Sequence, residues 1–311
     1  MIYMTNKTIA IQGNHPSKLN PATDTSIFLA NEIQNKNYRI FYYDPKDLSI
    51  INAKVIAKGF FIKFNYSKKK FYKILKKQKL DLTQCKFILI RQDPPFNLEY
   101  ISATYILDTI KDKVRIINNP TSIRNISEKL YSVKYQNFMP KTIFTQNIDE
   151  IKNFFKTHKK VILKPIHSFS GNDIHLLNRF NLKLIKKFIK KHNHIMCQKY
   201  LPKISQGDKR VFLINGLVCG AISRVPKKGS FLSNMSKGAK PIDIKLTKTE
   251  NKISKLIAKD LKKENIFFAG IDFIDQKLNG DINVTSPTGL KTLYDLSGTN
   301  LAKTFWKNLK V

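Results

Sequence analysis

A carboxylate in an apolar setting is the first feature of this chain that could do chemistry. Asp272 lies within residues 266–275, an apolar and aromatic stretch that predicts a buried strand. A charge in such a place is costly unless it is paired, hydrogen-bonded or bound to a metal ion. Asp272 is therefore either a core carboxylate bonded to main-chain amides or one ligand of a metal site.

A second polar group follows a few residues later. Asp281, Asn283 and Thr285 fall on one face of a predicted strand, and the residues between them are apolar. A hairpin turn predicted at residues 276–280 pairs this strand with the preceding buried one. The carboxylates and the Asn283 amide would then form an oxygen cluster that suits Mg²⁺. Because Asp281 follows Gly280, a simple turn residue is the competing interpretation.

Residues further upstream suit the phosphates and the base of a nucleotide. Lys164 ends an apolar strand before a loop of small residues, and Lys129 begins a predicted helix, so either side chain could reach a phosphate. In a chain so rich in Lys, an ordinary surface position is the alternative for each. Asp208, a candidate acceptor for ribose hydroxyls, follows an extended connector whose main chain could pair with an adenine edge. That connector consists of Gln198, Lys199, Tyr200 and Leu201.

Two arginines stand out because Arg is scarce in this chain. Only seven of the 56 basic residues are Arg, and Arg210 and Arg224 both lie on strand-like runs. A guanidinium group forks onto a carboxylate or a phosphate, so each is either a site residue or half of a structural ion pair. No Ser-His-Asp or Cys-His arrangement suggests a nucleophile.

The elements around these residues predict two parts. Residues 8–12 and 38–43 predict strands joined by a helix over about residues 24–34, which is typical of a parallel α/β sheet. Residues 86–91 predict another strand, and the loop after such a strand often carries ligands. We expect the first domain to span residues 1–120.

The second part, residues 121–311, predicts mixed strands and helices in two lobes of about residues 121–197 and 198–311. The Asn215-Gly216 pair between two apolar runs predicts a tight hairpin. Three further helices are predicted over about residues 68–79, 127–137 and 293–309.

The composition of the whole chain limits which kinds of binding partner we expect. The formal net charge is +34, but the lysines are spread along the whole chain without clustered Arg and aromatic residues, so we expect no specific nucleic-acid partner. No apolar run reaches the roughly 18 residues of a membrane span, which predicts a cytoplasmic protein without a membrane partner. Three widely spaced cysteines predict small buried side chains rather than disulfides or a zinc site.

Six motifs, in this order, resemble the prokaryotic glutathione synthetases of the ATP-grasp superfamily. The similarity runs from about residue 8 to residue 309, and the first and last motifs are the most specific to that family. The motifs are Arg91-Gln-Asp-Pro-Pro-Phe96, Ser127-Glu-Lys-Leu130, Ile162-Leu-Lys-Pro165, Gln198-Lys-Tyr-Leu-Pro202, Gly207-Asp-Lys-Arg-Val211 and Asp281-Ile-Asn-Val-Thr-Ser-Pro-Thr-Gly289.

The resemblance implies a fold of α/β and α+β parts: an N-terminal parallel α/β (pre-ATP-grasp) domain, then a two-lobed ATP-grasp domain that sandwiches ATP. It implies that ATP phosphorylates the carboxylate of γ-glutamylcysteine and that glycine attacks the acyl phosphate, giving glutathione, ADP and phosphate. The implied cofactors are ATP and Mg²⁺, with Mn²⁺ as a substitute, and a homo-oligomer is expected.

The resemblance also implies a role for each site residue. Lys129 and Lys164 would hold phosphates, residues 198–201 the adenine, and Asp208 the ribose. Arg210 and Arg224 would steady the transferred phosphoryl group, the acyl phosphate or the peptide carboxylate. The implied metal ligands are Asp272, Asp281 and Asn283, and the implied substrate-binding residues are Arg91, Asn234, Ser286 and Thr288.

Three departures from the family pattern affect loops at the implied site. The glycine-rich loop after the second lysine keeps only Gly171, and a second flexible loop keeps Asn234 and Gly238 but lacks an Arg. The family's metal-binding Glu is replaced by Asp281, which is one methylene shorter and follows a turn that is predicted to be longer.

The favoured interpretation is an ATP- and Mg²⁺-dependent carboxylate–amine ligase that makes glutathione. One alternative is the same fold with another amino-acid or peptide substrate, which the altered loops would favour. The other is a non-catalytic protein that binds nucleotides or nucleic acid, which the charge alone would suggest.

Overall fold

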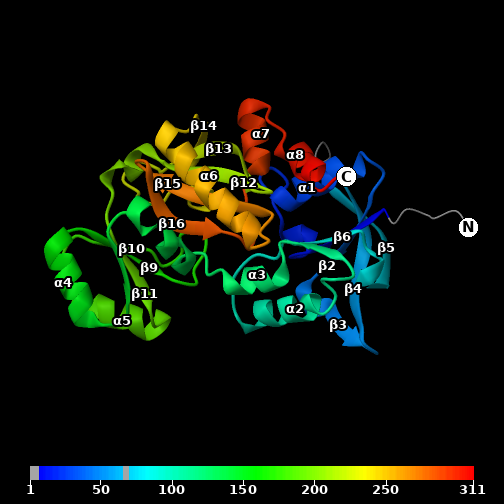
Figure 1. Cartoon of the computed structure of the whole chain (residues 1–311), viewed down its shortest axis with the longest axis horizontal. Helices are drawn as coiled ribbons and strands as arrows, with labels where there is room; N and C mark the ends of the chain where they lie inside the picture. Colours follow the sequence, from blue (N-terminus) through cyan, green and yellow to red (C-terminus); the bar gives the residue numbers. More distant parts are fainter. Residues whose placement is uncertain (1–6, 66–69) are drawn as a thin grey trace, which may run out of the picture.

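A computed structural model describes residues 7–65 and 70–311, which form three β-sheets with helices packed on them (Figure 1). One sheet belongs to the N-terminal part, at the right of Figure 1, and the other two belong to the rest of the chain. Among the described residues, no helix has the length and apolar character that a membrane span requires.

The N-terminal sheet has seven strands and a parallel centre. Its order is β3-β4-β2-β1-β6-β7, and β5 pairs with β4. All of β1 is buried, as expected for a strand that is covered on both faces. The bounds are β1 Thr8–Gln12, β2 Arg39–Tyr43, β3 Leu48–Ile51, β4 Lys54–Phe64, β5 Tyr72–Asp81, β6 Phe87–Ile90, β7 Arg115–Ile117, α1 Thr25–Gln34, α2 Leu98–Asp108 and α3 Pro120–Asn125.

The second sheet has four antiparallel strands in the order β10-β9-β11-β8 and lies with α4 and α5 at the left of Figure 1. Because β11 continues to Lys199, the lobe boundary predicted at residues 197–198 falls inside a strand. The bounds are β8 Thr142–Thr145, α4 Ile148–His158, β9 Val161–Pro165, β10 His175–Leu177, α5 Leu182–His192 and β11 Ile195–Lys199.

The third sheet has five antiparallel strands in the order β14-β13-β12-β15-β16. α6 starts with a capping box in which Thr247 and Glu250 bond each other's main-chain amides. The bounds are β12 Asp208–Ile214, β13 Leu217–Val225, β14 Lys240–Asp243, α6 Lys248–Lys263, β15 Phe268–Ile274, β16 Lys277–Asn283, α7 Leu290–Ser297 and α8 Leu301–Asn308.

The Lys-rich helix predicted over residues 68–79 is wrong for its described part. Residues 72–81 form β5, which pairs with β4 at nine positions, and residues 68 and 69 lie outside the described residues. Long-range pairing along β4 overrides the local helical pattern here. Its exposed lysines are typical of an edge strand, where charge discourages pairing with other chains.

Three other elements differ from their predictions. Residues 130–138 form a 3₁₀ helix rather than an α-helix. The closing helix is split into α7 and α8 because Gly298 has a φ of 73° and ends α7. The β15–β16 turn is the two-residue pair Asp275–Gln276, both with positive φ, so residues 277–280 belong to the strand rather than to the turn.

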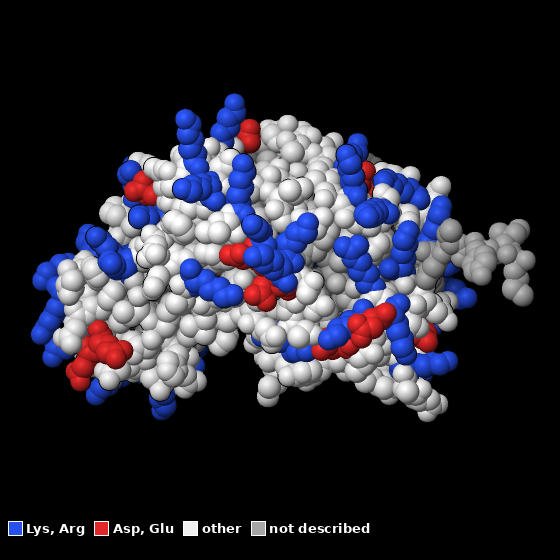
Figure 2. Space-filling view, in the orientation of Figure 1, with Lys and Arg blue, Asp and Glu red and all other residues white. Residues whose placement is uncertain are grey.

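Positively charged side chains are dispersed over the visible surface. Figure 2 shows Lys and Arg side chains in many places on this face, separated by uncharged areas, with fewer acidic side chains among them. On this face, the distribution agrees with a general composition bias of the exposed residues.

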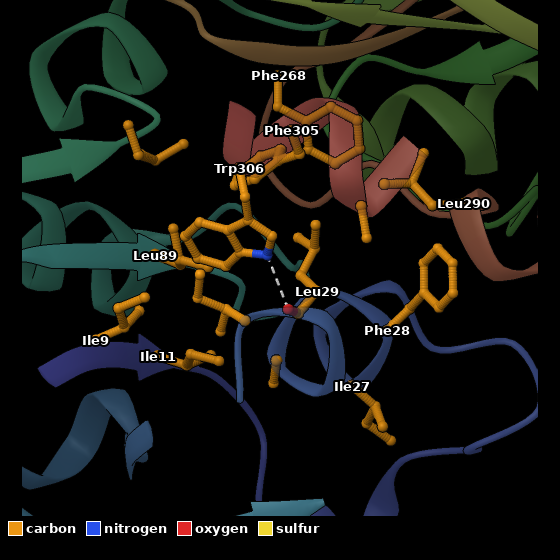
Figure 3. Close-up of a cluster of buried hydrophobic side chains, with 14 of the residues drawn as sticks. Ile9, Ile11, Ile27, Phe28, Leu29, Leu89, Phe268, Leu290, Phe305 and Trp306 are labelled. Carbon is orange, nitrogen blue, oxygen red and sulfur yellow. Dashed lines mark hydrogen bonds between the residues drawn. The ribbon is translucent and has the colours of Figure 1, made fainter. Parts of the chain in front are cut away.

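The C-terminal helices complete the core of the N-terminal sheet (Figure 3). Trp306 on α8 is fully buried, and its indole N–H donates a hydrogen bond to the Leu29 carbonyl on α1 at 2.9 Å. Phe305 packs edge-on against Phe268 of β15 in the same cluster. The first and last segments of the chain therefore share one hydrophobic core with the third sheet.

Candidate active site

A cavity of about 580 Å³ is lined by strands of the second and third sheets and by connecting segments from every part of the described chain. Its size is typical of a small-molecule site. It brings together 15 of the residues predicted from the sequence, and the structure places them around one space. They are Lys129, Lys164, Gln198, Lys199, Tyr200, Leu201, Asp208, Arg210, Arg224, Asn234, Asp272, Asp281, Asn283, Ser286 and Thr288.

A buried network of two arginines and two aspartates forms one wall of the cavity. Asp208 pairs with Arg224 across β12 and β13, and Arg210 pairs with Asp272 across β12 and β15, because each pair occupies opposite positions in the strand ladders. Arg224 donates to both Asp208 oxygens, at 2.7 and 2.6 Å, and also lies 3.1 Å from an Asp272 oxygen. Arg210 contacts Asp272 through two nitrogens. All four side chains are at least nine-tenths buried.

These arginines set the charge state of Asp272. Burial opposes ionisation of the carboxyl group, but Arg210 and Arg224 outweigh it and hold the pKa of Asp272 well below its usual range. In this state Asp272 is an ionised carboxylate whose charge is already balanced by guanidinium groups. The ion pairs predicted as the alternative to a site role are present, and they lie inside the cavity rather than away from it.

Two lysines meet at the third carboxylate. The Lys129 and Lys164 ammonium groups lie 3.4 and 3.5 Å from the two oxygens of Asp281. Lys164 also donates to the Asn279 carbonyl at 2.9 Å, and Lys129 to the Ser168 carbonyl at 2.9 Å. Neither lysine is an ordinary surface residue, since both side chains are about 5% exposed.

Irregular pairing between β15 and β16 brings Asp281 to these lysines. Ile271 pairs with Ile282 and Phe273 with Leu278, so one residue of β15, Asp272, opposes three residues of β16, 279–281. This bulge supplies the extra length that the sequence predicted in the turn. Gly280 lies inside it with a φ of 85°, and a Cβ there would come within 2.5 Å of the Met196 side chain.

The donor set fits a hard cation and a polyphosphate. Asn283 donates its amide nitrogen to the Gly270 carbonyl at 3.1 Å and lies 3.5 Å from Asp272, which leaves its amide oxygen free of hydrogen bonds to the described residues. Asp272, Asp281 and that oxygen are the ligand types that Mg²⁺ prefers. The described part of the chain contains no cluster of three or more His, Cys, Asp and Glu residues that could hold a metal ion, so this donor set depends on the Asn283 amide as well as the carboxylates.

The two altered loops meet at the cavity. Gly171 has a φ of 71°, and a Cβ on it would come within 2.2 Å of the Asn234 amide oxygen. Lys237 donates to the Asn172 side chain at 2.9 Å. The single remaining glycine of the first loop is therefore required by close contact with the second loop, not only by the approach of a ligand.

The expected adenine connector begins at the end of β11. Gln198 is buried and donates to Thr142 at 3.0 Å, whereas Lys199 is exposed and Tyr200 and Leu201 are half-buried. All four line the cavity. A role for the connector in binding adenine stays a prediction.

Arg91 lies apart from the other predicted residues. Its side chain is buried, donates to Ser26 at 3.1 Å and faces a separate small cavity between β6, β15 and α8. Its carbonyl accepts a hydrogen bond from Ser286 at 3.4 Å, and its guanidinium group interacts electrostatically with Asp24 and Asp93 at the edge of the site. The neighbouring Asp93 and Pro94 line the large cavity instead.

Sequence reasoning missed two residues that hold the cavity wall. Glu128 accepts hydrogen bonds from Val284 and Thr285, and it belonged to a quoted motif in which only the lysine was given a role. Asn118 uses its amide for four bonds, to Phe267, Phe268 and Val284, at 2.7 to 2.9 Å. No sequence pattern pointed to Asn118.

Comparisons with known proteins agree with this architecture. The family "Prokaryotic glutathione synthetase, N-terminal domain" matches residues 8–124, and "Prokaryotic glutathione synthetase, ATP-grasp domain" matches residues 128–298. The chain is 33% identical to the glutathione synthetase of Agrobacterium fabrum, with 96% of this chain and 95% of that protein covered. It is 35% identical to the glutathione synthetase of Brucella melitensis, with 96% of each covered.

Solved structures show the same fold at low identity. The D-alanyl-alanine synthetase A of Vibrio cholerae superposes with a TM-score of 0.64 at 14% identity, covering 99% of this chain and 98% of that one. A D-cycloserine synthetase superposes with a TM-score of 0.65 at 10% identity, covering 97% and 99%. The sequence matches and the shared fold show that this chain belongs to the prokaryotic glutathione synthetase family and is an ATP-dependent carboxylate–amine ligase of the ATP-grasp fold.

Proposed function

We propose that this protein joins γ-glutamylcysteine to glycine at the expense of ATP, giving glutathione, ADP and phosphate. The observation that carries the proposal is the meeting, in one cavity, of four buried cations with two carboxylates and an amide oxygen. The cations are Lys129, Lys164, Arg210 and Arg224, and the oxygen donors are Asp272, Asp281 and Asn283. The curated relatives are named glutathione synthetases, which supports glutathione as the product.

The carboxylate of γ-glutamylcysteine would attack the γ-phosphorus of ATP, and the bond from that phosphorus to ADP would break. The glycine amine would then attack the acyl carbon, expel phosphate and lose a proton to solvent. Both steps need mainly positioning and neutralisation of negative charge. Lys129, Lys164, Arg210 and Arg224 supply that neutralisation, with low mobility because each is buried and held by hydrogen bonds.

Magnesium, when bound, would add charge neutralisation between the carboxylates and the phosphates. Asp272, Asp281 and Asn283 would hold it, with Mn²⁺ as a substitute. Residues 198–201 would contact the adenine. The proposed ribose contact of Asp208 requires one of its oxygens to leave Arg224 or Ser233, which donates to it at 2.6 Å.

The neighbourhood of Ser286, Thr288 and Asn234 would receive the peptide substrate, because all three residues line the same cavity. Arg91 would act behind them, through the hydrogen bond from Ser286 to its carbonyl.

A cytoplasmic location and a homo-oligomeric state also remain proposals. Cell fractionation would test the location, and light scattering would test the oligomeric state.

The test is phosphate release by the purified protein with ATP, Mg²⁺, γ-glutamylcysteine and glycine, with each component left out in turn. Release that requires both amino-acid substrates, together with glutathione detected by mass spectrometry, is the expected result. Release with another acceptor but not with glycine would show a ligase of different specificity. No release with any acceptor, despite measurable ATP binding, would contradict the enzymatic proposal.

A further inference from the structure

One residue caps the open edge of the strand that carries the proposed metal ligands. β16 is the last strand of its sheet, so its outward N–H groups have no neighbouring strand (Figure 1). The Ile282 amide donates to the Glu128 carbonyl at 2.9 Å, and the Val284 amide donates to the Glu128 side chain at 2.8 Å. The Thr285 amide and hydroxyl donate to the same carboxylate oxygen, at 3.1 and 2.9 Å.

The Ile282 and Val284 amides have no access to water that could replace Glu128, whereas Thr285 lines the cavity. Ile282 and Val284 are fully buried, and Thr285 is 6% exposed. A buried main-chain amide that loses its acceptor destabilises its position, and an uncapped strand edge is free to shift. The Val284 carbonyl is fixed separately, since it accepts a hydrogen bond from Asn118 at 2.8 Å.

The capped amides lie between the side chains that face the cavity. Asp281 and Asn283 alternate with the buried Ile282 and Val284, so fixing those two amides fixes the direction of both polar side chains. At the other end of the contact, Lys129 follows Glu128 directly, and its ammonium group lies 3.4 Å from Asp281. A single residue thus joins a phosphate-binding candidate to a pair of metal-ligand candidates.

We propose that Glu128 is a positioning residue that sets the distance between Lys129 and the Asp281–Asn283 segment, and through it the affinity for the metal–nucleotide pair. Glu128 acts as a hydrogen-bond acceptor of a given length, not as a charge that meets the ligand. The inference rests on the proposed function in one respect, that Asp281 and Asn283 hold the divalent cation.

Two conservative variants separate length from charge. Glu128→Gln keeps the chain length and an acceptor oxygen but loses the charge, whereas Glu128→Asp keeps the charge but withdraws the acceptor by one methylene. The matched control is Glu250→Asp, because Glu250 is also buried and accepts a main-chain amide, that of Thr247 at 2.8 Å, but does not line the cavity.

The measurement is Mn²⁺ binding by electron paramagnetic resonance in the presence of a non-hydrolysable ATP analogue, with thermal unfolding of each variant alongside. We expect Glu128→Asp to weaken Mn²⁺ binding by about 10- to 100-fold, the range seen when the support of a metal ligand is removed. Glu128→Gln should stay within about threefold of the natural protein, and Glu250→Asp should leave Mn²⁺ binding unchanged even if it unfolds at a lower temperature.

Two results would overturn the proposal. If Glu128→Gln weakens Mn²⁺ binding and Glu128→Asp does not, the charge of Glu128 meets the ligand directly. If Glu128→Asp and Glu250→Asp weaken it equally at the same loss of stability, the role is only structural. The Mn²⁺-binding assay uses no amino-acid substrate. Its result therefore does not depend on whether the phosphate-release test succeeds or fails.

Discussion

Asp281 is the residue on which the assignment of the site depends most. Burial opposes its ionisation, but the ammonium groups of Lys129 and Lys164 outweigh it and hold the pKa of Asp281 below its ordinary value. The carboxylate is therefore charged at neutral pH and lies between two cations. A bound polyphosphate would compete with Asp281 for the two lysines. The Asp281 carboxylate would then be available to the metal ion that accompanies the polyphosphate.

We predict that Asp281→Asn lowers turnover by at least about 100-fold, because a neutral amide is a weak ligand for a hard cation. Circular dichroism should show an unchanged fold. The matched control is Asp275→Asn in the turn of the same hairpin, where the carboxylate pairs at 2.7 Å with an exposed Lys203. Turnover that survives in Asp281→Asn would remove Asp281 from the metal site.

The sequence named the charged residues of the cavity but not their partners. Asp272 was expected to be either bonded to amides or bound to metal. The structure pairs it with Arg210 and Arg224 rather than with main-chain amides, and the metal role stays a prediction. The pairing follows from strand register, which places Arg210 opposite Asp272 although 62 residues separate them. Register depends on long-range hydrogen bonding, so the local pattern around Asp272 carried no trace of it.

At the scale of elements, α2 and α3 are joined by a polar contact at the junction between the first sheet and the rest of the chain. Asp108 at the end of α2 accepts hydrogen bonds from Thr121 and Arg124, both at 2.6 Å, and pairs with Lys111 at 3.1 Å. Burial alone would raise the pKa of Asp108, but these hydrogen bonds outweigh it and hold the pKa below its ordinary value.

A carboxyl group with a lowered pKa in the folded protein stabilises the fold above the unfolded pKa of about 3.9, and this contribution disappears as the pH falls through the lower, folded value. We predict that Asp108→Asn reduces the free energy of unfolding by about 1 kcal/mol at pH 7, with the difference vanishing in strong acid.

Urea unfolding of Asp108→Asn and of the natural protein between pH 2.5 and 7 would check this. Asp112→Asn, which removes an exposed carboxylate close to the end of the same helix, is the control and should keep most of the pH slope. A constant difference between Asp108→Asn and the natural protein at every pH would show that packing, not ionisation, is affected.

Elements were predicted well where one pattern decided the outcome. The apolar runs of β1, β6, β9 and β15 all lie where the sequence placed them. Predictions failed where two patterns competed. The lysine spacing of β5 has a helical period, yet β4 offers hydrogen bonds along its whole length, and the strand wins.

At the scale of the whole molecule, the chain closes on itself. Trp306 of α8 lies against Leu29 of α1, so the end of the chain helps to cover the sheet that its beginning forms (Figure 3). Because Trp306 is the single tryptophan of the chain, its fluorescence reports on this contact alone.

We predict that the fluorescence and the far-ultraviolet circular dichroism of the natural protein change in one coincident unfolding transition, since the first and third sheets share this core. Trp306→Phe should lower the free energy of unfolding by about 1–3 kcal/mol through a lost hydrogen bond and a small cavity. Leu296→Ala, at an exposed position of α7, should change it by no more than about 0.5 kcal/mol. Fluorescence that changes well before circular dichroism would contradict the shared core.

The sequence by itself determined the family, the order of strands and helices around the site, and the types of residue that meet in the cavity. These depend on local patterns and motifs, which short stretches of chain retain. Only the tertiary structure decided that Asp272 is held by two arginines, that a bulge at Gly280 brings Asp281 to two lysines, and that Glu128 caps the edge of β16. Each of those depends on which distant strands pair and in what register, and that choice is made by the free energy of the whole fold.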